Sequence, residues 1–219
     1  MDMKTRAAFF DMDKTLVRVN TGRLYASWRF SRGETRLRDL LRVSWWSLQY
    51  TLGVVDADAV SRYAARALAG LEERAFADEC RAWYASAVRP HVTGRARSEV
   101  ERRHRDGYVV AILTGSSPYV AGPLADELGI DHVISSRLVV NDGCFTGDVE
   151  ALCYGPGKVT RALEWSALHG IDLAASAFYT DSLSDLPMLE RVGEPRIVNP
   201  DPRLRALAKS RGWPIEIWT

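Results

Sequence analysis

Acidic and hydroxyl side chains follow a short apolar run near the start of the chain. The run, Ala7–Phe10, has the composition of a buried strand and is followed by Asp11, Asp13 and Thr15. Positions two apart on a strand project to the same side, so we expect the carboxylates of Asp11 and Asp13 to be neighbours. Neighbouring carboxylates repel each other unless a cation or a shared proton compensates them. Taken alone, the stretch is equally typical of a solvated strand end or a helix N-cap.

Two other parts of the chain carry groups suited to binding an anion. The apolar run at 108–113 ends in Thr114, Gly115 and Ser116. A hydroxyl and exposed backbone N–H groups at a strand-to-helix junction can hold an oxyanion. Lys158 opens a helix after Gly-Pro-Gly, and these glycines lack the spacing of a nucleotide-binding Walker A loop. Each of these features also occurs at ordinary helix starts.

A second pair of carboxylates follows the apolar run at 177–180. Asp181 and Asp185 stand four residues apart across a turn into a helix, a spacing that lets both face one site. Oxygen ligands without a grouping of His or Cys suit Mg²⁺, which binds through one or two carboxylates and keeps waters and phosphate oxygens as its other ligands. We therefore expect Mg²⁺ as the cofactor.

The runs that carry these groups alternate with helical patterns. This alternation predicts an α/β fold built on a doubly wound, Rossmann-like parallel sheet. Further strands are expected at 132–135, 196–199 and 215–218, and an Asn-Asp-Gly turn at 141–143 predicts a small β-hairpin outside the sheet. The carboxyl ends of the strands in such a sheet line the ligand crevice, so we expect these groups to converge there.

Residues 17–88 contain no convincing strand and show apolar residues at helical spacing. We interpret them as a helical cap inserted after the first strand of a core that comprises residues 1–16 and 89–219. Glycines and polar helix starts divide this insertion into four expected helices, near 22–31, 35–52, 57–69 and 72–88.

The first half of the insertion is rich in arginine and tryptophan. Between residues 18 and 42, seven arginines stand against two acidic residues, and Trp28, Trp45 and Trp46 are interspersed or follow closely. Three interpretations remain open: a solvated helical face, a surface that rests on anionic lipid, and a basic mouth that attracts an anionic substrate.

Composition narrows the class of protein. The net charge of +1 over 219 residues argues against a protein devoted to nucleic acid. No run approaches the ~18 apolar residues of a membrane span, and no signal peptide is indicated. Three widely spaced cysteines without a CxxC pair are interpreted as reduced packing residues. We therefore expect a cytoplasmic protein, and the sequence yields no prediction of its oligomeric state.

Taken together, the motifs resemble those of a known family. Phe-Phe-Asp-Met-Asp-Lys-Thr-Leu, Ile-Leu-Thr-Gly-Ser, Gly-Lys158 and Tyr-Thr-Asp-Ser-Leu-Ser-Asp-Leu-Pro-Met-Leu are similar to the four ordered motifs of the haloacid dehalogenase (HAD) superfamily. The chain most resembles the phosphoserine phosphatase-like branch, subfamily IB. The similarity covers residues 6–16 and about 88–219, and four motifs in the family's order make a specific signal.

The resemblance implies a role for each motif residue. Asp11 would attack phosphorus and form an aspartyl-phosphate, and Asp13 would act as general acid and then general base. The implied metal set is Asp11, Asp13 (partly through its backbone carbonyl), Asp181 and Asp185, with Asp185 orienting water and lysine. Charge on the phosphoryl oxygens would be neutralised by the remaining motif residues: Thr114, Gly115, Ser116, Lys158 and Ser184.

The sequence also departs from the phosphoserine phosphatase pattern. Asn20 stands where an acidic residue is usual, Arg62 and Arg66 do not align cleanly with the family's Arg-Val pattern, and Ser184 replaces the usual asparagine. The reaction is therefore expected to be phosphomonoester hydrolysis of a small metabolite whose identity stays open. The alternatives are a lipid or lysolipid phosphate substrate at a membrane surface and, in a different class, a phospho-accepting switch without turnover.

Overall fold

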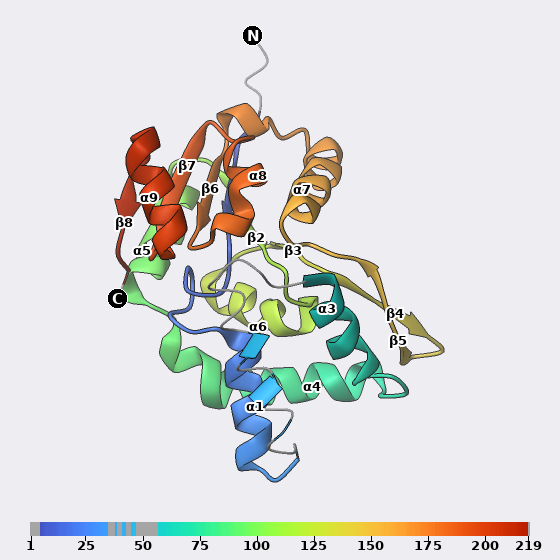
Figure 1. Cartoon of the computed structure of the whole chain (residues 1–219). Helices are drawn as coiled ribbons and strands as arrows, with labels where there is room; N and C mark the ends of the chain where they lie inside the picture. The colour runs from blue at the N-terminus through green and yellow to red at the C-terminus, as the bar shows by residue number, and fades with distance from the viewer. Residues whose placement is uncertain (1–4, 35–37, 39–40, 43–44, 47–56, 219) are drawn as a thin grey trace.

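The computed structural model describes residues 5–34, 38, 41–42, 45–46 and 57–218. Its centre is a six-stranded sheet in the order β3-β2-β1-β6-β7-β8, in which every neighbouring pair is parallel. The strands are β1 Ala7–Phe10, β2 Val109–Leu113, β3 His132–Ile134, β6 Ala177–Thr180, β7 Glu194–Val198 and β8 Ile215–Glu216. The α/β prediction is confirmed, and the strands start and end within a few residues of the predicted positions (Figure 1).

The order of the strands reverses at β1. From β1 the chain builds the sheet outward through β2 and β3, and it then returns to the other side of β1 to add β6, β7 and β8. Phe10 pairs with Ile112 of β2 and with Tyr179 of β6. The residues that directly follow these three strands therefore lie at one edge of the sheet, at the kind of switch point where open α/β sheets bind ligands.

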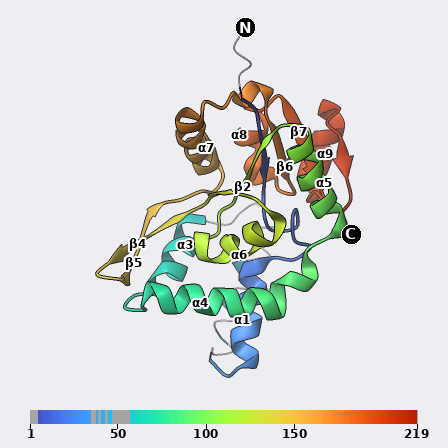
Figure 2. The ribbon, with the colours of Figure 1, turned by 180° about the vertical axis from the view of Figure 1, so that it is seen from behind.

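Helices cover both faces of the sheet because alternate strand residues point to opposite sides. On one face, Phe10 and Ile112 pack with α5 (Gly94–Arg105) and α6 (Pro118–Leu128). On the other, Phe9 and Phe178 pack with α7 (Pro156–His169), α8 (Leu186–Leu189) and α9 (Pro202–Arg211). Figure 2 shows α5 in front of the sheet when the molecule is seen from behind. The predicted doubly wound arrangement is thus present.

The described part of the insertion is built mainly of helices. It contains α1 (Thr21–Ser31), α3 (Ala57–Arg66) and α4 (Glu73–Trp83), followed by a π-helical turn at Tyr84–Val88. These correspond to three of the four predicted helices, and most of the segment predicted near 35–52 lies outside the described residues. Among the helices described, none has the length and apolar character that crossing a membrane requires.

The predicted hairpin is present and has a partner that was not predicted. Strands β4 (Arg137–Asn141) and β5 (Cys144–Ala151) form a separate two-stranded antiparallel sheet. Its backbone bonds to the insertion, because the N–H of Gly70 donates to the carbonyl of Phe145 at 2.8 Å. A β-carbon at Gly147, where φ is +91°, would lie 3.0 Å from that of Ala69. The hairpin thus joins the core to the insertion (Figure 1).

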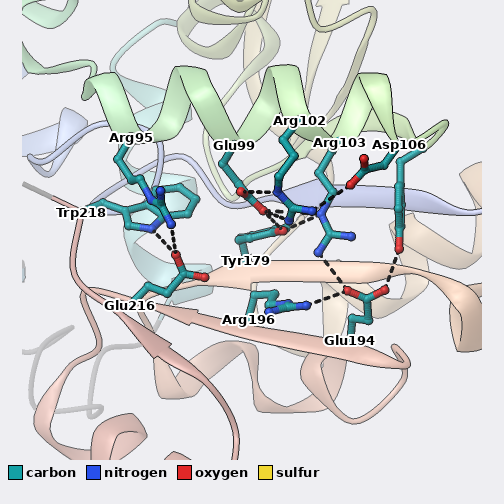
Figure 3. A network of polar contacts seen from close by, with 11 residues as sticks. Arg95, Glu99, Arg102, Arg103, Asp106, Tyr179, Glu194, Arg196, Glu216 and Trp218 are labelled. Atoms are coloured by element: carbon teal, nitrogen blue, oxygen red, sulfur yellow. Dashed lines mark hydrogen bonds and ion pairs between the residues drawn. The ribbon is translucent and has the colours of Figure 1, made fainter.

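A network of charges, which we call the α5 network, joins α5 to β6 and β7 (Figure 3). Its centre is Arg103, only 2% exposed, which donates through Nε to the Tyr179 hydroxyl at 2.6 Å and through a terminal nitrogen to Glu194 at 2.9 Å. The Tyr179 hydroxyl donates in turn to Glu99. The burial of Glu99 and Arg103 within this helix was not predicted from the sequence.

Candidate active site

Lys158 lies buried between two carboxylates at the carboxyl edge of the sheet. Its Nζ is 2.6 Å from Asp11 Oδ1 and 2.7 Å from Asp185 Oδ2. Burial opposes the charged form of Lys158, but the two carboxylates outweigh it and raise the pKa of the ammonium. The preceding Gly157 is required for this placement, because a β-carbon there would lie 2.2 Å from the Leu152 carbonyl oxygen.

Asp11 directly follows β1, and its N–H donates to the carbonyl of Tyr179 at 2.9 Å. Burial raises the pKa of Asp11 to about 7, with Lys158 opposing the rise and Asp185 adding to it. Asp185 is held by Thr180, whose hydroxyl donates to Oδ2 at 2.7 Å. We call the group formed by Asp11, Asp181, Asp185 and Lys158 the carboxylate–lysine cluster.

Asp181 is the member of this cluster whose charge is least compensated. It is 2% exposed, and its Oδ1 is buried without a hydrogen-bond partner in the described part of the chain. Its Oδ2 lies 3.7 Å from Lys14 Nζ. Burial and the nearby Asp11 raise the pKa of Asp181 well above its ordinary value. A buried carboxylate oxygen without a hydrogen-bond partner is suited to bind a hard cation.

Asp13 lies beyond the end of β1, so strand alternation does not position it, but its carboxylate is near enough to Asp11 to raise the pKa of that carboxyl. The strand β1 ends at Phe10, and a turn carries Asp13 to the start of α1. There its Oδ1 accepts from the Thr21 hydroxyl at 2.6 Å, and both carboxylate oxygens lie 3.1 Å from the Thr21 N–H. Burial raises the pKa of Asp13, and the hydrogen bonds from Thr21 oppose the rise. Its carboxyl group is thus fixed by a helix N-terminus.

The side chains of the four predicted metal-binding aspartates have different partners in the structure. Within the residues that the structure describes, no group of three or more His, Cys, Asp or Glu side chains is arranged to hold a metal ion. Asp13 is bound to Thr21 and Asp185 to Lys158 and Thr180. Asp11 and Asp181 remain as the carboxylates available to a cation, a number that fits Mg²⁺ because this ion keeps several waters.

The loop after β2 carries the predicted anion-binding residues. Thr114 is buried, and its hydroxyl accepts from the Ser116 N–H at 3.2 Å. Ser136 connects this loop to the segment before Lys158, because its hydroxyl donates to the Gly115 carbonyl at 2.8 Å and accepts from the Cys153 N–H at 3.0 Å. Since β1 and β2 are neighbours in register, this loop lies at the same edge of the sheet as Asp11.

Hydroxyl groups near the fourth motif form a second feature of the site. Ser184 Oγ lies 2.9 Å from Ser182 Oγ. Burial raises the pKa of Tyr154, and a hydrogen bond with the Ser184 side chain opposes the rise. A β-carbon on Gly115 would lie 3.6 Å from the Tyr154 ring, so Tyr154 reaches from the β2 loop to Ser184. Its position just before Gly-Pro-Gly-Lys158 is the only sequence signal that pointed to it.

The positions that depart from the phosphoserine phosphatase pattern have structural explanations. Asn20 is the N-cap of α1, and its side chain accepts from the Arg23 N–H at 2.9 Å. Arg62 and Arg66 lie exposed on α3.

Part of the arginine-rich surface of the insertion is neutralised locally, since Arg29 forms ion pairs with Glu34 and Glu79.

Comparison with known proteins agrees with this geometry. The family model described as haloacid dehalogenase-like hydrolase matches residues 8–190. Three relatives are similar over nearly the whole chain. An inhibition of morphological differentiation protein of Streptomyces azureus is 36% identical over 95% of this chain and 77% of its own. A probable phosphatase of Mycobacterium tuberculosis is 33% identical over 95% and 74%. A phosphoserine phosphatase of the same organism is 31% identical over 96% and 70%.

Solved structures show the same fold. A Bordetella pertussis protein of unknown function has a TM-score of 0.87 and 30% identity, covering 97% of this chain and 98% of its own. A phospho-aspartyl intermediate analogue of phosphoserine phosphatase has a TM-score of 0.71 and 23% identity, covering 98% and 93%. At that identity the second structure supports the fold alone.

Proposed function

The chain belongs to the haloacid dehalogenase-like hydrolases and is a phosphatase, and from this premise we propose that it is a Mg²⁺-dependent phosphomonoester hydrolase. We propose further that it acts through an aspartyl-phosphate on a small phosphorylated metabolite in the cytoplasm. The observation that carries the proposal is the carboxylate–lysine cluster, in which Lys158 bridges Asp11 and Asp185 beside an unpartnered oxygen of Asp181. Three free cysteines support a reducing compartment.

In the first step a carboxylate oxygen of Asp11 attacks phosphorus, and the bond between phosphorus and the substrate's ester oxygen breaks. Lys158 favours the ionised form of Asp11, whereas burial favours the neutral form. Asp13 donates a proton to the departing alcohol oxygen, a role that its raised pKa suits. Thr21 fixes the direction in which that proton is presented.

In the second step water attacks phosphorus, and Asp13, now ionised, accepts the water proton. The acyl-phosphate bond breaks, and Asp11 is regenerated as inorganic phosphate leaves. In this proposal Thr114, Gly115, Ser116 and Ser184 donate to the phosphoryl oxygens, together with Lys158. Asp11 and Asp181 would hold Mg²⁺, which would supply positive charge against the charge that develops on the phosphoryl group.

Turnover of an aryl phosphate tests the proposal. We expect many turnovers with Mg²⁺ and almost none after chelation by EDTA. The Asp13→Asn variant should lose roughly 10²-fold or more in kcat, because it lacks the group that protonates the alcohol. A single burst without turnover would instead indicate the phospho-accepting switch, and near wild-type turnover by Asp13→Asn would refute its role.

The substrate is the open part of the proposal. Similarity to a phosphoserine phosphatase supports a small phosphorylated substrate, whereas Asn20 is engaged as a helix cap where an acidic residue is usual. Rates on a panel that includes phosphoserine, histidinol phosphate and lysophospholipid phosphates would discriminate among the candidates. A preference for one compound by kcat/KM identifies the class.

One observation favours the lipid phosphate alternative. Leu41 and Trp45 are 60% and 58% exposed, and Arg38 and Arg42 are also exposed nearby in sequence. Exposed apolar side chains beside arginines are typical of surfaces that rest on anionic lipid. Cosedimentation with anionic liposomes that weakens in high salt would support this alternative. Absence of binding at low salt would exclude it.

A further inference from the structure

Lys14 occupies a backbone conformation that side chains other than glycine rarely adopt. Its φ is +55°, in the left-handed region, and it stands one residue after Asp13. Glycine would adopt this conformation without strain, so a long side chain at this position suggests that the side chain has a use.

The backbone of Lys14 is held in this conformation from two sides. Its N–H donates to the carbonyl of Val19 at 3.2 Å, and its carbonyl accepts from Asn199 Nδ2 at 2.8 Å. Asn199 is itself left-handed, with φ of +45°, and its Oδ1 accepts from the N–H of the buried Trp218 at 2.8 Å. The C-terminal segment thus anchors the loop that carries Lys14.

The side chain of Lys14 extends to the least compensated carboxylate of the site. Its Nζ lies 3.7 Å from Asp181 Oδ2, while Asp181 Oδ1 has no hydrogen-bond partner in the described chain. The Lys14 side chain is 34% exposed, whereas Asp181 is 2% exposed. An ammonium on a flexible, partly solvated stem can pair with a buried carboxylate and can also move away from it.

We propose that Lys14 is a built-in counter-ion of Asp181 that a divalent cation has to displace, so that Lys14 lowers the affinity of the site for Mg²⁺ and stabilises the chain without it. This inference rests on the metal dependence in the proposed function. Two cations near one carboxylate repel each other, and burial strengthens this repulsion. Lys158 differs because it bridges Asp11 and Asp185 and stays in place.

Titration calorimetry of Mg²⁺ into the metal-free full chain tests the inference without a measurement of turnover. We expect Lys14→Gln to bind Mg²⁺ roughly tenfold more tightly than wild type, because one repelling charge is gone. Lys14→Arg should bind like wild type because it retains the charge. Lys209→Gln, an exposed lysine on α9, is the matched control and should also bind like wild type.

Thermal unfolding provides a second readout. In EDTA, Lys14→Gln should melt below wild type, and saturating Mg²⁺ should raise its melting temperature by more than it raises that of wild type. Lys14→Asn repeats the test with less backbone strain at this position, since asparagine adopts the left-handed region more readily.

The outcomes separate this inference from the proposed function. Equal or weaker Mg²⁺ binding by Lys14→Gln and Lys14→Asn, with normal binding by wild type, would overturn the inference and leave the proposed function intact. Absence of Mg²⁺ binding by wild type and by all variants would overturn both.

Discussion

Two buried groups of charges lie on the same sheet, and they have opposite electrostatics. In the carboxylate–lysine cluster, burial raises the pKa of Asp11 to about 7 and that of Asp181 well above its ordinary value. In the α5 network, hydrogen bonds from Tyr108 and Arg103 outweigh burial and lower the pKa of Glu194 to about 2 (Figure 3). Burial raises the pKa of the acids in both groups, so the opposite net shifts come from the groups that pair with each acid.

The comparison shows that a buried charge does not by itself indicate a functional site. Arg103 is as deeply buried as Lys158, yet its carboxylate partners are matched by Arg102 and Arg196. In the cluster, Lys158 pairs with two carboxylates and Lys14 lies beside the third, Asp181, one oxygen of which has no hydrogen-bond partner in the described chain. Excess negative charge, maintained at a cost in stability, is what a cation and a phosphoryl group require.

The largest expected effect is on turnover. Asp11→Asn should reduce kcat on an aryl phosphate by roughly 10³-fold or more, because the nucleophile is removed while the side-chain volume is kept. Steady-state kinetics with Mg²⁺ measures this loss, and circular dichroism checks that the fold is retained. Activity within tenfold of wild type would remove Asp11 from the nucleophile's role.

The next largest effect is on stability. Arg103→Met should lower the free energy of unfolding by about 2 kcal/mol, because the variant removes the charged hydrogen bonds to the Tyr179 hydroxyl and to Glu194. Urea unfolding measures it, with Arg105→Met on the same helix, an exposed arginine at 68% exposure, as the control. The kcat of the folded variant should stay near that of wild type. A small stability change would show that the α5 network is dispensable.

Asp181→Asn should have opposite effects on stability and on activity. Without Mg²⁺ the free energy of unfolding of the variant should be about 1 kcal/mol higher than that of wild type, because a buried and poorly compensated charge is gone. With Mg²⁺ it should lose most of its turnover. If the variant proved less stable than wild type in EDTA, the contrast between the two groups of charges would not hold.

The smallest expected effect depends on pH. The folded-state pKa of Glu194 is lowered from 4.5 to about 2, so its ionised form stabilises the folded chain above pH 4.5. This contribution is lost as pH falls from about 4.5 towards 2. The stability difference between wild type and Glu194→Gln should therefore be largest near neutral pH and shrink across this interval. A difference independent of pH would contradict the lowered pKa.

Much of the core was predictable because its elements are encoded locally. The strands at 7–10 and 177–180 occur as predicted, since apolar runs define them within a few positions. The proximity of Asp11 and Asp185 also follows from the rule that parallel strands place their carboxyl ends at one edge, whereas Lys158 reaches them from the start of α7.

What could not be predicted depends on where the chain turns and what it then meets. The carboxylate of Asp13 is near Asp11, as expected, but it is held by Thr21 at the start of α1 and not by strand alternation, because the strand ends before Asp11. The contact of the hairpin with Gly70 and the pairing of Lys14 with Asp181 join residues more than 70 positions apart. Composition and periodicity carry no information about such pairs.

By itself, the amino-acid sequence determined the order of strands and helices and the kinds of groups that follow each strand, because hydrophobic period and turn chemistry act over a few residues. Only the tertiary structure decided which of those charges are compensated. Glu99 and Asp181 are both buried acids, and the first is matched by arginines while the second keeps an unpartnered oxygen. Electrostatic free energy depends on distances in space and on burial, which only the folded chain defines.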